Sequence, residues 1–451
     1  MTTSMRALIL RGDAAHLPLP DASVDLIVTS PPYFGLRSYT DGGEHYDGQI
    51  GNEATPRAYL EALWACTAEW VRVLKPSGSL FVNLGDKYAS GGRATYNGTW
   101  RRDKAGGNEA RAADGMREKS LLGMPWRYAL GCVDQTSEHY RAEYIASLYD
   151  DVLRGEMTWR AFSRAAKAFD AEPKSAGLGL ILRAEIVWAK PNGLPESVTD
   201  RVRRSHEQVF HFTRQPRYYS AVDEVREAHS GPWKSPGGSN PAKAIGPADR
   251  NGHSQWERTR EERDATVRNP LGKLPDSVWS IPSAPLTVPA HLGVDHFAAY
   301  PPELVRRIIL GWSPAAVCTG CGEGRRPVSE RGYDLLATRS ERSKAFRALE
   351  PLAKTRMYDQ TMSGRTTITG YACACPDATA PATPGIVLDP FCGTGTSMLV
   401  ASVFGRIGIG VDRSADYCRL AQWRCSDPGE RARAMDVPKP PPVADGQEPL
   451  F

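Results

Sequence analysis

The stretch Val24-Asp25-Leu26-Ile27-Val28-Thr29-Ser30-Pro31-Pro32-Tyr33 decides the fold. Its apolar first half predicts a buried strand, which runs directly into a small hydroxyl, two prolines and an aromatic ring. Prolines fix φ and donate no hydrogen bond, so their carbonyls and the Ser30 hydroxyl are available as acceptors, while Tyr33 adds a flat face. The stretch therefore predicts a rigid pocket for a planar ring with an amino group, such as a nucleic-acid base. Ser-Pro and Pro-Pro also mark ordinary turns, which is the alternative.

A second motif lies near the other end of the chain, at Val387-Leu388-Asp389-Pro390-Phe391-Cys392-Gly393-Thr394-Gly395-Thr396-Ser397. It predicts a strand, a glycine-rich turn and a helix, and the next strand, 406–411, ends at Asp412. Such a turn lets a ligand approach the backbone closely, while the acidic residue bonds ribose hydroxyls. A dinucleotide fits poorly, because Met398 stands where the third glycine is needed and Asp389 would repel a pyrophosphate. A cationic ligand with a ribose, such as S-adenosylmethionine, fits better.

The rest of the chain alternates between strand and helix patterns, which predicts an α/β fold with a parallel sheet. Strands are expected at 6–10, 24–28, 79–84, 178–188, 207–212, 386–388 and 406–411. Helices are expected at 59–74, within 296–312, at 396–404 and at 415–423, with a helical insertion at 137–171. The strand at 207–212 is expected to form a hairpin with 178–188. The polar segment 90–119 is either a disordered surface loop or a loop that orders against a phosphate backbone. The segment 222–285 is either a structural insertion or a recognition surface that contacts bases or phosphates.

Composition and charge narrow the class of protein. The 451 residues suffice for two or three domains, and the net charge of +4 is uneven, with basic clusters at 93–119 and 201–217 that permit a polyanion-binding face. No apolar run reaches the length of a membrane span, and the N-terminus lacks the apolar run of a signal peptide. Nine cysteines, an odd number, argue against a disulfide framework and favour a reducing cytoplasm.

Four of the cysteines form two close pairs on either side of a basic stretch, Cys318 with Cys321 and Cys373 with Cys375. This pattern predicts a small structural zinc site, because four thiolates leave no open position on the metal for chemistry. The second pair has C-x-C rather than C-x2-C spacing, so buried free thiols are the alternative.

Together the two motifs resemble those of the DNA amino-methyltransferases of the permuted β group. Residues 389–396 are similar to their cofactor motif, D-P-F-x-G-[ST]-G-T, and residues 29–33 to their catalytic motif, [DNS]-P-P-[YFW], which comes first, as in that group. Residues 186–192 resemble the loop that borders the target base, and 296–304 the helix before the cofactor motif. The resemblance implies a circularly permuted, Rossmann-like methyltransferase sheet. It also implies a cytoplasmic, S-adenosylmethionine-dependent enzyme whose partner is double-stranded DNA, with a restriction endonuclease as a potential counterpart.

The resemblance further implies roles for individual residues. The catalytic residues are Ser30, Pro31, Pro32 and Tyr33: Ser30 Oγ and the Pro31 carbonyl accept the two amino protons of a flipped base, which stacks on Tyr33. The amino-acid end of S-adenosylmethionine is held by Asp389, Phe391, Gly393, Thr394 and Gly395. Asp412 binds its ribose, and Asp13 lies near its adenine. A helix cap at Asp412 and an ordinary turn at Asp13 are the alternatives.

The target is expected to be N4 of cytosine, because Ser before Pro-Pro-Tyr is more usual in that subgroup and Asp in the N6-adenine subgroup. Methylation of a cytosine carbon requires a cysteine that follows a proline, and no cysteine here does; Cys392 is expected to be a packing residue. The alternatives are N6-adenine methylation, a catalytically idle DNA-binding protein on the same scaffold, and methylation of RNA or of a protein amide.

These predictions divide the chain into successive parts. The methyltransferase core is expected to comprise the catalytic half at 1–89, strands at 178–222, the helix before the cofactor motif at 285–314 and the cofactor-binding half at 376–426. The insertions are expected to be a loop and helical segment at 90–177, a target-recognition region at 223–284 and the cysteine-containing segment at 315–375, followed by a disordered tail at 427–451.

Overall fold

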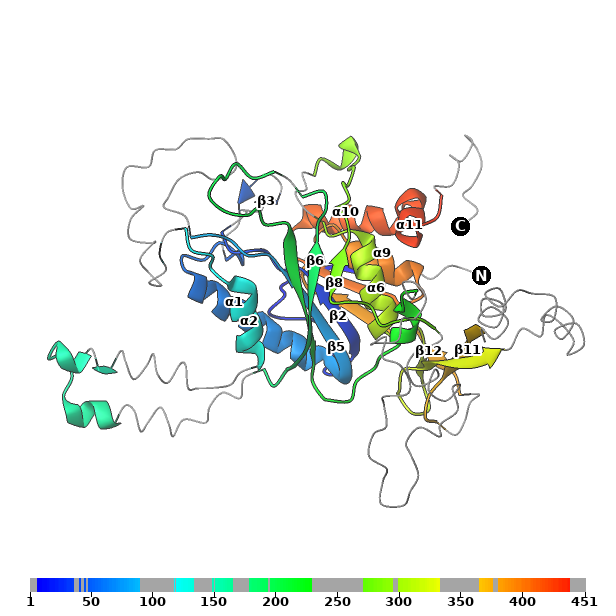
Figure 1. Cartoon of the computed structure of the whole chain (residues 1–451), viewed down its shortest axis with the longest axis horizontal. Helices are drawn as coiled ribbons and strands as arrows, with labels where there is room; N and C mark the ends of the chain where they lie inside the picture. Colours follow the sequence, from blue (N-terminus) through cyan, green and yellow to red (C-terminus); the bar gives the residue numbers. More distant parts are fainter. Residues whose placement is uncertain are drawn as a thin grey trace, which may run out of the picture.

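A sheet of eight strands runs through the centre of the protein (Figure 1). The structure is a computed structural model and describes residues 6–35, 40–41, 44–45, 48–89, 117, 119–133, 148–149, 151–164, 178–193, 195–228, 271–294, 299–332, 365–375 and 380–438. The strand order is β1 (Ala7–Arg11), β14 (Ile407–Asp412), β13 (Ile386–Asp389), β2 (Val24–Thr29), β5 (Leu74–Leu84), β7 (His206–Thr213), β6 (Ile181–Ala189) and β8 (Val278–Ser280). From β1 to β5 neighbouring strands are parallel, whereas β7 is antiparallel to both of its neighbours.

The two sequence motifs follow neighbouring strands of this sheet. β2 pairs with β13 in parallel, with Val387 opposite Leu26 and Leu388 opposite Ile27. The carboxyl ends of parallel neighbours open at the same edge of a sheet. The segment 30–33 and the turn after Asp389 therefore leave the sheet side by side, although they are far apart in the sequence.

Helices cover both faces of the sheet (Figure 1). On one face lie α1 (Pro56–Val73) and α2 (Met124–Val133), and on the other lie α6 (Pro302–Trp312) and α9 (Thr396–Val403). The parallel strands are thus buried on both sides, which explains why they appear in the sequence as continuous apolar runs.

Successive residues of β2 point to the two helical layers. Ile27 packs into the cluster that contains α1 and α2, whereas Leu26 and Val28 pack into the cluster that contains α6 and α9. After the last core strand, α10 (Ala415–Ser426) and α11 (Pro428–Met435) complete the chain's described part.

Smaller elements lie outside the central sheet. Three short antiparallel pairs are β3 (Thr40–Asp41) with β4 (Glu44–His45), β9 (Val317–Cys318) with β12 (Ala382–Thr383), and β10 (Arg326–Gly332) with β11 (Arg365–Ala372). Two short 3-10 turns are η2 (Val222–Val225) and η4 (Ala290–Leu292). Of these, β9 to β12 belong to or flank the cysteine-containing insertion.

The core strands and helices predicted from the sequence are confirmed, with several shifted boundaries; β6 begins at Ile181 rather than at 178, and α10 ends at Ser426 rather than at 423. α1 begins earlier than expected because Thr55 caps it: Ala58 N donates to Thr55 Oγ1 at 3.1 Å, and Pro56 occupies the first turn. β5 begins at Leu74 rather than at the expected residue 79, because Leu74 pairs with Val24 across a register shift. β6 and β7 form the expected antiparallel pair.

The prediction of a disordered tail over 427–451 is wrong for its first part. α11 forms there because Asp427 caps it, with Glu430 N donating to Asp427 Oδ1 at 2.8 Å, and because Ala432 and Ala434 are buried. In the predicted target-recognition region, 223–284, β8 adds an edge strand to the sheet, and Trp279 is only 3% exposed. Trp279 is therefore a packing residue and not part of an exposed recognition surface, which were the two roles that the sequence left open.

Parts of several predicted segments lie outside the described residues. These parts are 90–116, 134–147, 165–177, 229–270, 333–364 and 439–451. Of the helical insertion expected at 137–171, the described residues 148–149, 151–153 and 159–164 are helical. None of the helices in the described ranges combines the length and the hydropathy that crossing a bilayer requires.

His211 on β7 is a titratable group within the core. Its ring stacks on Phe81 with the centroids 4.2 Å apart, and its Nε2 lies 3.0 Å from Ser79 Oγ. Burial, and then the charge of Arg183, lowers the pKa of His211 from 6.5 to about 3. The unfolded chain therefore binds a proton here below pH 6.5, which the folded chain binds only near pH 3.

We expect this residue to make stability fall with acidity, by about 1.4 kcal/mol per pH unit as the pH decreases below the unfolded value. His211→Phe keeps an aromatic ring on Phe81 and should remove that part of the slope, whereas a substitution at the exposed His16, His16→Gln, should retain it. Urea unfolding at several pH values between 6.5 and 3 measures the slopes. Equal slopes for His211→Phe and the wild type would contradict the assignment.

Candidate active site

The carboxyl ends of β2, β13 and β14 form one polar edge of the sheet. The segment 30–33 follows β2, the glycine turn follows β13, and Asp412 ends β14. The Asp412 carbonyl accepts a hydrogen bond from Gly12 N at 2.9 Å, which brings the end of β1 and Asp13 to the same edge. Ligands of open α/β sheets bind outside the carboxyl ends of strands, so this edge is the candidate active site.

Ser30 and Tyr33 belong to a network of polar side chains from the neighbouring strands. Tyr33 OH donates to Glu207 Oε2 at 2.7 Å, and Asn83 Nδ2 lies 2.8 Å from both of these oxygens. Ser30 Oγ lies 3.3 Å from Tyr33 OH and from Asn83 Nδ2. Lys190, directly after β6, forms an ion pair with Glu207. The network fixes the position of the tyrosine hydroxyl from β5, β6 and β7 together.

The two prolines differ in what their carbonyls bind. The Pro32 carbonyl accepts a hydrogen bond from Tyr59 OH at 2.9 Å, whereas no donor among the described residues reaches the Pro31 carbonyl. A Cβ atom on Gly85 would lie 2.6 Å from Cε2 of Tyr33, so the ring can pack against the end of β5 only because this residue is glycine. The role of the Pro31 carbonyl as an acceptor for a base stays a prediction.

The turn after β13 depends on two glycines in the left-handed region, with φ of +48° at Gly393 and +78° at Gly395. Gly393 N donates to Asp412 Oδ2 at 2.9 Å, and Ser414 N donates to Asp412 Oδ1 at 2.9 Å. These two bonds hold the Asp412 carboxylate against the turn. A Cβ atom on Gly395 would lie 2.7 Å from Cβ of Ala421, so α10 approaches the turn closely only because this residue is glycine.

The structure rejects the helix-cap alternative for Asp412 and supports the turn alternative for Asp13. Asp412 is not a helix cap, because Ser414 caps α10 by accepting a hydrogen bond from Tyr417 N at 3.3 Å. Asp13 does stabilise a turn, since its Oδ1 accepts a hydrogen bond from Ala15 N at 2.9 Å. A contact of Asp13 with an adenine ring stays a prediction.

A buried arginine, Arg424, donates hydrogen bonds to the glycine turn. Arg424 is 2% exposed, and its Nη1 donates to the Thr394 carbonyl at 3.0 Å and to Thr394 Oγ1 at 2.9 Å. Its Nε donates to Glu430 Oε2 at 2.9 Å. Burial lowers the pKa of Arg424, and the adjacent Glu430 opposes this shift. The pair thus joins the turn to α10 and α11.

Asp389 faces the protein interior and is only 1% exposed. Its Oδ2 accepts hydrogen bonds from Tyr300 OH at 2.8 Å and Ser397 Oγ at 2.7 Å, and its Oδ1 accepts one from Phe391 N at 3.1 Å. Burial raises the pKa of this carboxyl, while the hydrogen bonds to it oppose the shift. Asp389 therefore fastens the start of the turn to the segment before α6.

The other two residues of the turn pack against the core. The ring of Phe391 meets Trp70 edge-on, with the centroids 5.8 Å apart. Cys392 is 5% exposed, and burial raises the pKa of its thiol well above the ordinary value. A buried, protonated thiol is a poor nucleophile, which fits the packing role expected for Cys392.

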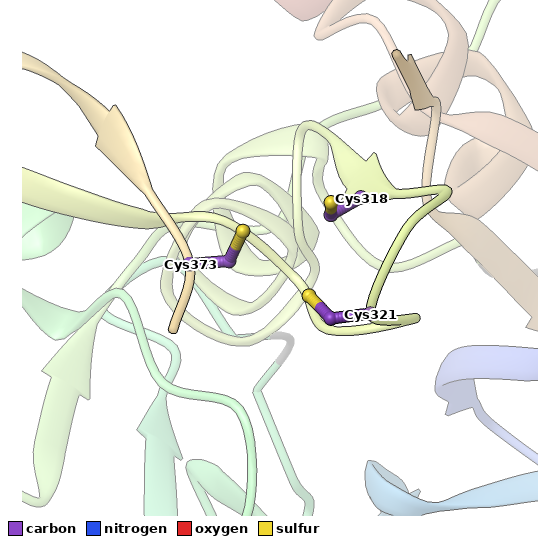
Figure 2. A group of neighbouring side chains, drawn as sticks. All are labelled: Cys318, Cys321 and Cys373. Atoms are coloured by element: carbon purple, nitrogen blue, oxygen red, sulfur yellow. The ribbon is translucent and has the colours of Figure 1, made fainter. Parts of the chain in front are cut away.

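Three of the four candidate metal ligands converge at one point (Figure 2). The sulfur atoms of Cys318, Cys321 and Cys373 all lie within 4.8 Å of one another. Cys375 lies next to this group, two residues beyond Cys373, and is partly buried. The predicted pairing of the two distant cysteine pairs in space is therefore observed for three side chains.

Arginines in the basic cluster 201–217 bind other parts of the protein. The guanidinium of Arg201 lies 3.8 Å from the ring centroid of Tyr88, Arg204 lies 3.7 Å from the Asp86 carboxylate, and Arg214 donates to the Leu74 carbonyl. These arginines thus contribute to folding, and the polyanion-binding face predicted there stays a prediction.

The fold places the chain among doubly wound α/β proteins with a ligand site at the carboxyl edge of the sheet. Among solved structures it is similar to the PvuII DNA methyltransferase (cytosine-N4-specific), with a TM-score of 0.45 and 15% identity over 96% of this chain and 92% of that one. A family model described as DNA methylase matches residues 24–316 and 379–423.

Two curated relatives are Type II methyltransferases. M.Cfr9I of Citrobacter freundii is 31% identical over 67% of this chain and 72% of the relative. M.XycI of Xanthomonas campestris pv. cyanopsidis is 33% identical over 67% of this chain and 71% of the relative. The chain belongs to the family of N6/N4-type DNA methylases, the DNA amino-methyltransferases.

Sequence reasoning missed several residues of the site, namely Asn83, Lys190, Glu207, Tyr300 and Arg424. For Asn83 a signal exists, because it is a polar side chain within the apolar second half of a strand that ends near the motif edge, whereas Glu207 lies in the polar first part of β7. A buried polar residue in such a strand requires partners, which indicates a site. Arg424 in its amphipathic helix carries no comparable signal.

The packing of the glycine turn yields a stability prediction. Gly395→Ala forces both a left-handed alanine and a clash with Ala421, so it should lower the free energy of unfolding by about 3 kcal/mol. Gly293→Ala is the matched control, because its φ is +60° but nothing lies within 4 Å of the added atom, so strain alone should cost about 1 kcal/mol. Chemical denaturation measures both losses. Equal losses in the free energy of unfolding would show that close packing of α10 against the turn does not contribute to the cost.

Proposed function

We propose that this DNA methylase transfers a methyl group from S-adenosylmethionine to N4 of a cytosine that is flipped out of double-stranded DNA. The observation that carries the proposal is the parallel pairing of β2 with β13, which sets the acceptors of the Ser-Pro-Pro-Tyr segment beside the glycine turn. The family match supports DNA as the substrate. One sheet edge then serves both the base and the cofactor.

The chemistry follows from the two acceptors beside β2. The lone pair of an exocyclic amine is delocalised into the ring, so the nitrogen is a weak nucleophile. If Ser30 Oγ and the Pro31 carbonyl accept hydrogen bonds from its two N–H groups, the nitrogen is drawn towards a tetrahedral geometry and its lone pair is directed out of the ring plane. Once the methyl group is on the nitrogen, the cofactor sulfur leaves as a neutral thioether and the nitrogen would lose one proton to solvent. Tyr33, anchored by Glu207 and Asn83, provides the surface on which the base stacks. Rate enhancement then comes from positioning and electrostatics, without a covalent intermediate.

The glycine turn fits the cofactor side of this reaction. When bound, S-adenosylmethionine supplies an electrophilic methyl group on a sulfonium. The Asp412 carboxylate, oriented by Gly393 N and Ser414 N, would accept hydrogen bonds from ribose hydroxyls. The backbone of Phe391, Gly393, Thr394 and Gly395 would border the amino-acid end, and Asp389 would act mainly by fixing this turn. Asp13, at the adjacent end of β1, would lie near the adenine.

Cytosine is preferred over adenine because Ser30 precedes Pro-Pro-Tyr, the variant more usual in the N4-cytosine subgroup. An idle DNA-binding protein is less well supported, since both acceptors of the base pocket and the whole glycine turn are intact. We assign target recognition to 223–284, excluding the buried Trp279. A restriction endonuclease counterpart also stays a prediction, as does the cytoplasmic location.

The reaction is tested by incubating the purified chain with mixed duplex DNA and labelled S-adenosylmethionine, and then identifying the modified nucleoside by mass spectrometry. We expect N4-methylcytosine, in one sequence context. N6-methyladenine would establish the adenine alternative, whereas tight DNA binding without any incorporation would establish the idle scaffold.

Ser30→Ala should lower turnover by about a hundredfold, because one of the two acceptors that act in the transition state is removed. The affinity for S-adenosylmethionine, measured by calorimetry, should stay within about twofold of the wild type, since Ser30 belongs to the base side of the edge. Ser426→Ala, on the exposed end of α10, is the control and should change neither value. Parallel losses of turnover and cofactor affinity would refute the assigned role.

Glu207→Gln should act through Tyr33 rather than on the base directly. It weakens the acceptor of the tyrosine hydroxyl and leaves Lys190 without its carboxylate partner, so we expect turnover to fall about tenfold with little change in cofactor affinity. Fluorescence of 2-aminopurine at the target position should show less stable base flipping. Glu61→Gln, in an exposed pair with Arg57, is the control. Unchanged flipping and turnover would show that the network is only structural.

A further inference from the structure

The cysteine-containing insertion leaves the core after α6 and returns to it at β13. The family match stops at residue 316 and resumes at 379, so this segment is additional to the part of the chain that the family shares. Its two ends are held together at the core: β9 pairs with β12, and Thr319 N donates to the Pro381 carbonyl at 2.9 Å. Cys318 lies in β9 itself, and the other three cysteines lie near this short pair of strands.

The first cysteine pair is presented by a tight turn. Gly322 N donates to the Cys318 carbonyl at 2.8 Å, Cys318 N donates to the Glu323 carbonyl at 2.9 Å, and Gly322 has a φ of +74°. This turn directs the side chains of Cys318 and Cys321 to the same side, and Cys373 faces them from the strand end after β11 (Figure 2). The three sulfur atoms thus meet from both ends of the insertion.

The sulfur of Cys375 lies near the turn that carries the first cysteine pair. A Cβ atom on Gly320 would lie 3.5 Å from Cys375 Sγ and 3.7 Å from Cys318 Sγ, so both sulfurs border the same small space. Zinc bound to thiolates at about 2.3 Å in a tetrahedron places the sulfur atoms about 3.8 Å apart. The limit of 4.8 Å for the sulfurs of Cys318, Cys321 and Cys373 is near that spacing, and Cys375, which lies outside this group, is the candidate for the fourth position.

Neither core packing nor disulfide formation fits this cluster as well as metal binding does. Packing of small apolar side chains does not account for it, because Cys321 is exposed and Cys373 and Cys375 are only partly buried. Disulfide formation does not account for it either, because Cys318, Cys321, Cys373 and Cys375 are all free cysteines. Soft thiolate ligands in a four-sulfur set favour zinc, and a closed set of this kind has a structural rather than a catalytic role.

We propose that Cys318, Cys321, Cys373 and Cys375 bind one Zn²⁺ ion that closes the insertion at its base. β12 and β13 follow the second pair closely, and Gly385, just before β13, packs so tightly on Pro314 that a Cβ atom would lie 2.3 Å from the Pro314 carbonyl oxygen. The ion therefore fixes the distance between the end of α6 and the start of β13. The β10–β11 ribbon, which starts and ends beside the cysteines, is anchored to the core by the same ion.

The test uses the full chain, purified without a metal-affinity tag, and measures its zinc by plasma mass spectrometry. We expect one zinc per chain in the wild type, and about tenfold less in Cys318→Ser and in Cys373→Ser. Cys425→Ser, on α10 away from the cluster, is the matched control and should keep its zinc. Zinc-free wild-type protein, or full zinc content in Cys373→Ser, would overturn the proposal.

A second measurement on the wild type remains decisive if a variant fails to fold. A mercurial that blocks thiols should release the zinc, detected by a chromogenic chelator, and the zinc-free chain should be cleaved by trypsin faster between residues 322 and 372 while the core fragments persist. Zinc release without thiol modification, or no change in cleavage within the insertion, would contradict the assignment. Cys375→Ser tests the fourth ligand: unchanged zinc affinity in this variant would overturn the four-sulfur set.

Discussion

The parallel pairing of β2 with β13 is the constraint on which the rest of the structure depends. Hydrogen bonding of these strands, with Val387 opposite Leu26 and Leu388 opposite Ile27, joins the beginning of the chain to its end. Because both strands are buried between two helical layers, their register is determined by the core. Two polar segments that share no local sequence context therefore leave the sheet as neighbours, one rich in acceptors and one in glycine.

The polar edge is held in place by buried side chains that do not face it directly. Asp389 joins the glycine turn to Tyr300 and Ser397, and the pair of Arg424 and Glu430 joins it to the last two helices. Such groups are expensive to bury unless each finds a partner, and here each does. The backbone at Gly393 and Gly395 is thus fixed before any ligand arrives, which is the preorganisation that a positioning enzyme requires.

Much of this could be predicted from the sequence. Two apolar runs, 24–28 and 386–388, indicated the two strands, and the proline and glycine residues that follow them indicated the two motifs. Hydrophobic periodicity and turn-forming residues are local properties of the sequence, so both could be recognised without the structure. Glu207 and Tyr300 could not be assigned to the site, since their hydrogen-bond partners come from distant parts of the chain. α11 was missed because a short polar segment gains its stability from the cap at Asp427 and from packing on α9 rather than from its composition.

The central claim, that one cleft serves both the base pocket and the glycine turn, is tested most directly by amide hydrogen exchange with and without S-adenosylmethionine. The pairing of β2 with β13 predicts slower exchange at residues 391–395 and 412–414, and also at Ser30 and Tyr33 across the strand boundary. Protection that is confined to one of the two segments, or that appears only elsewhere in the chain, would contradict a shared cleft.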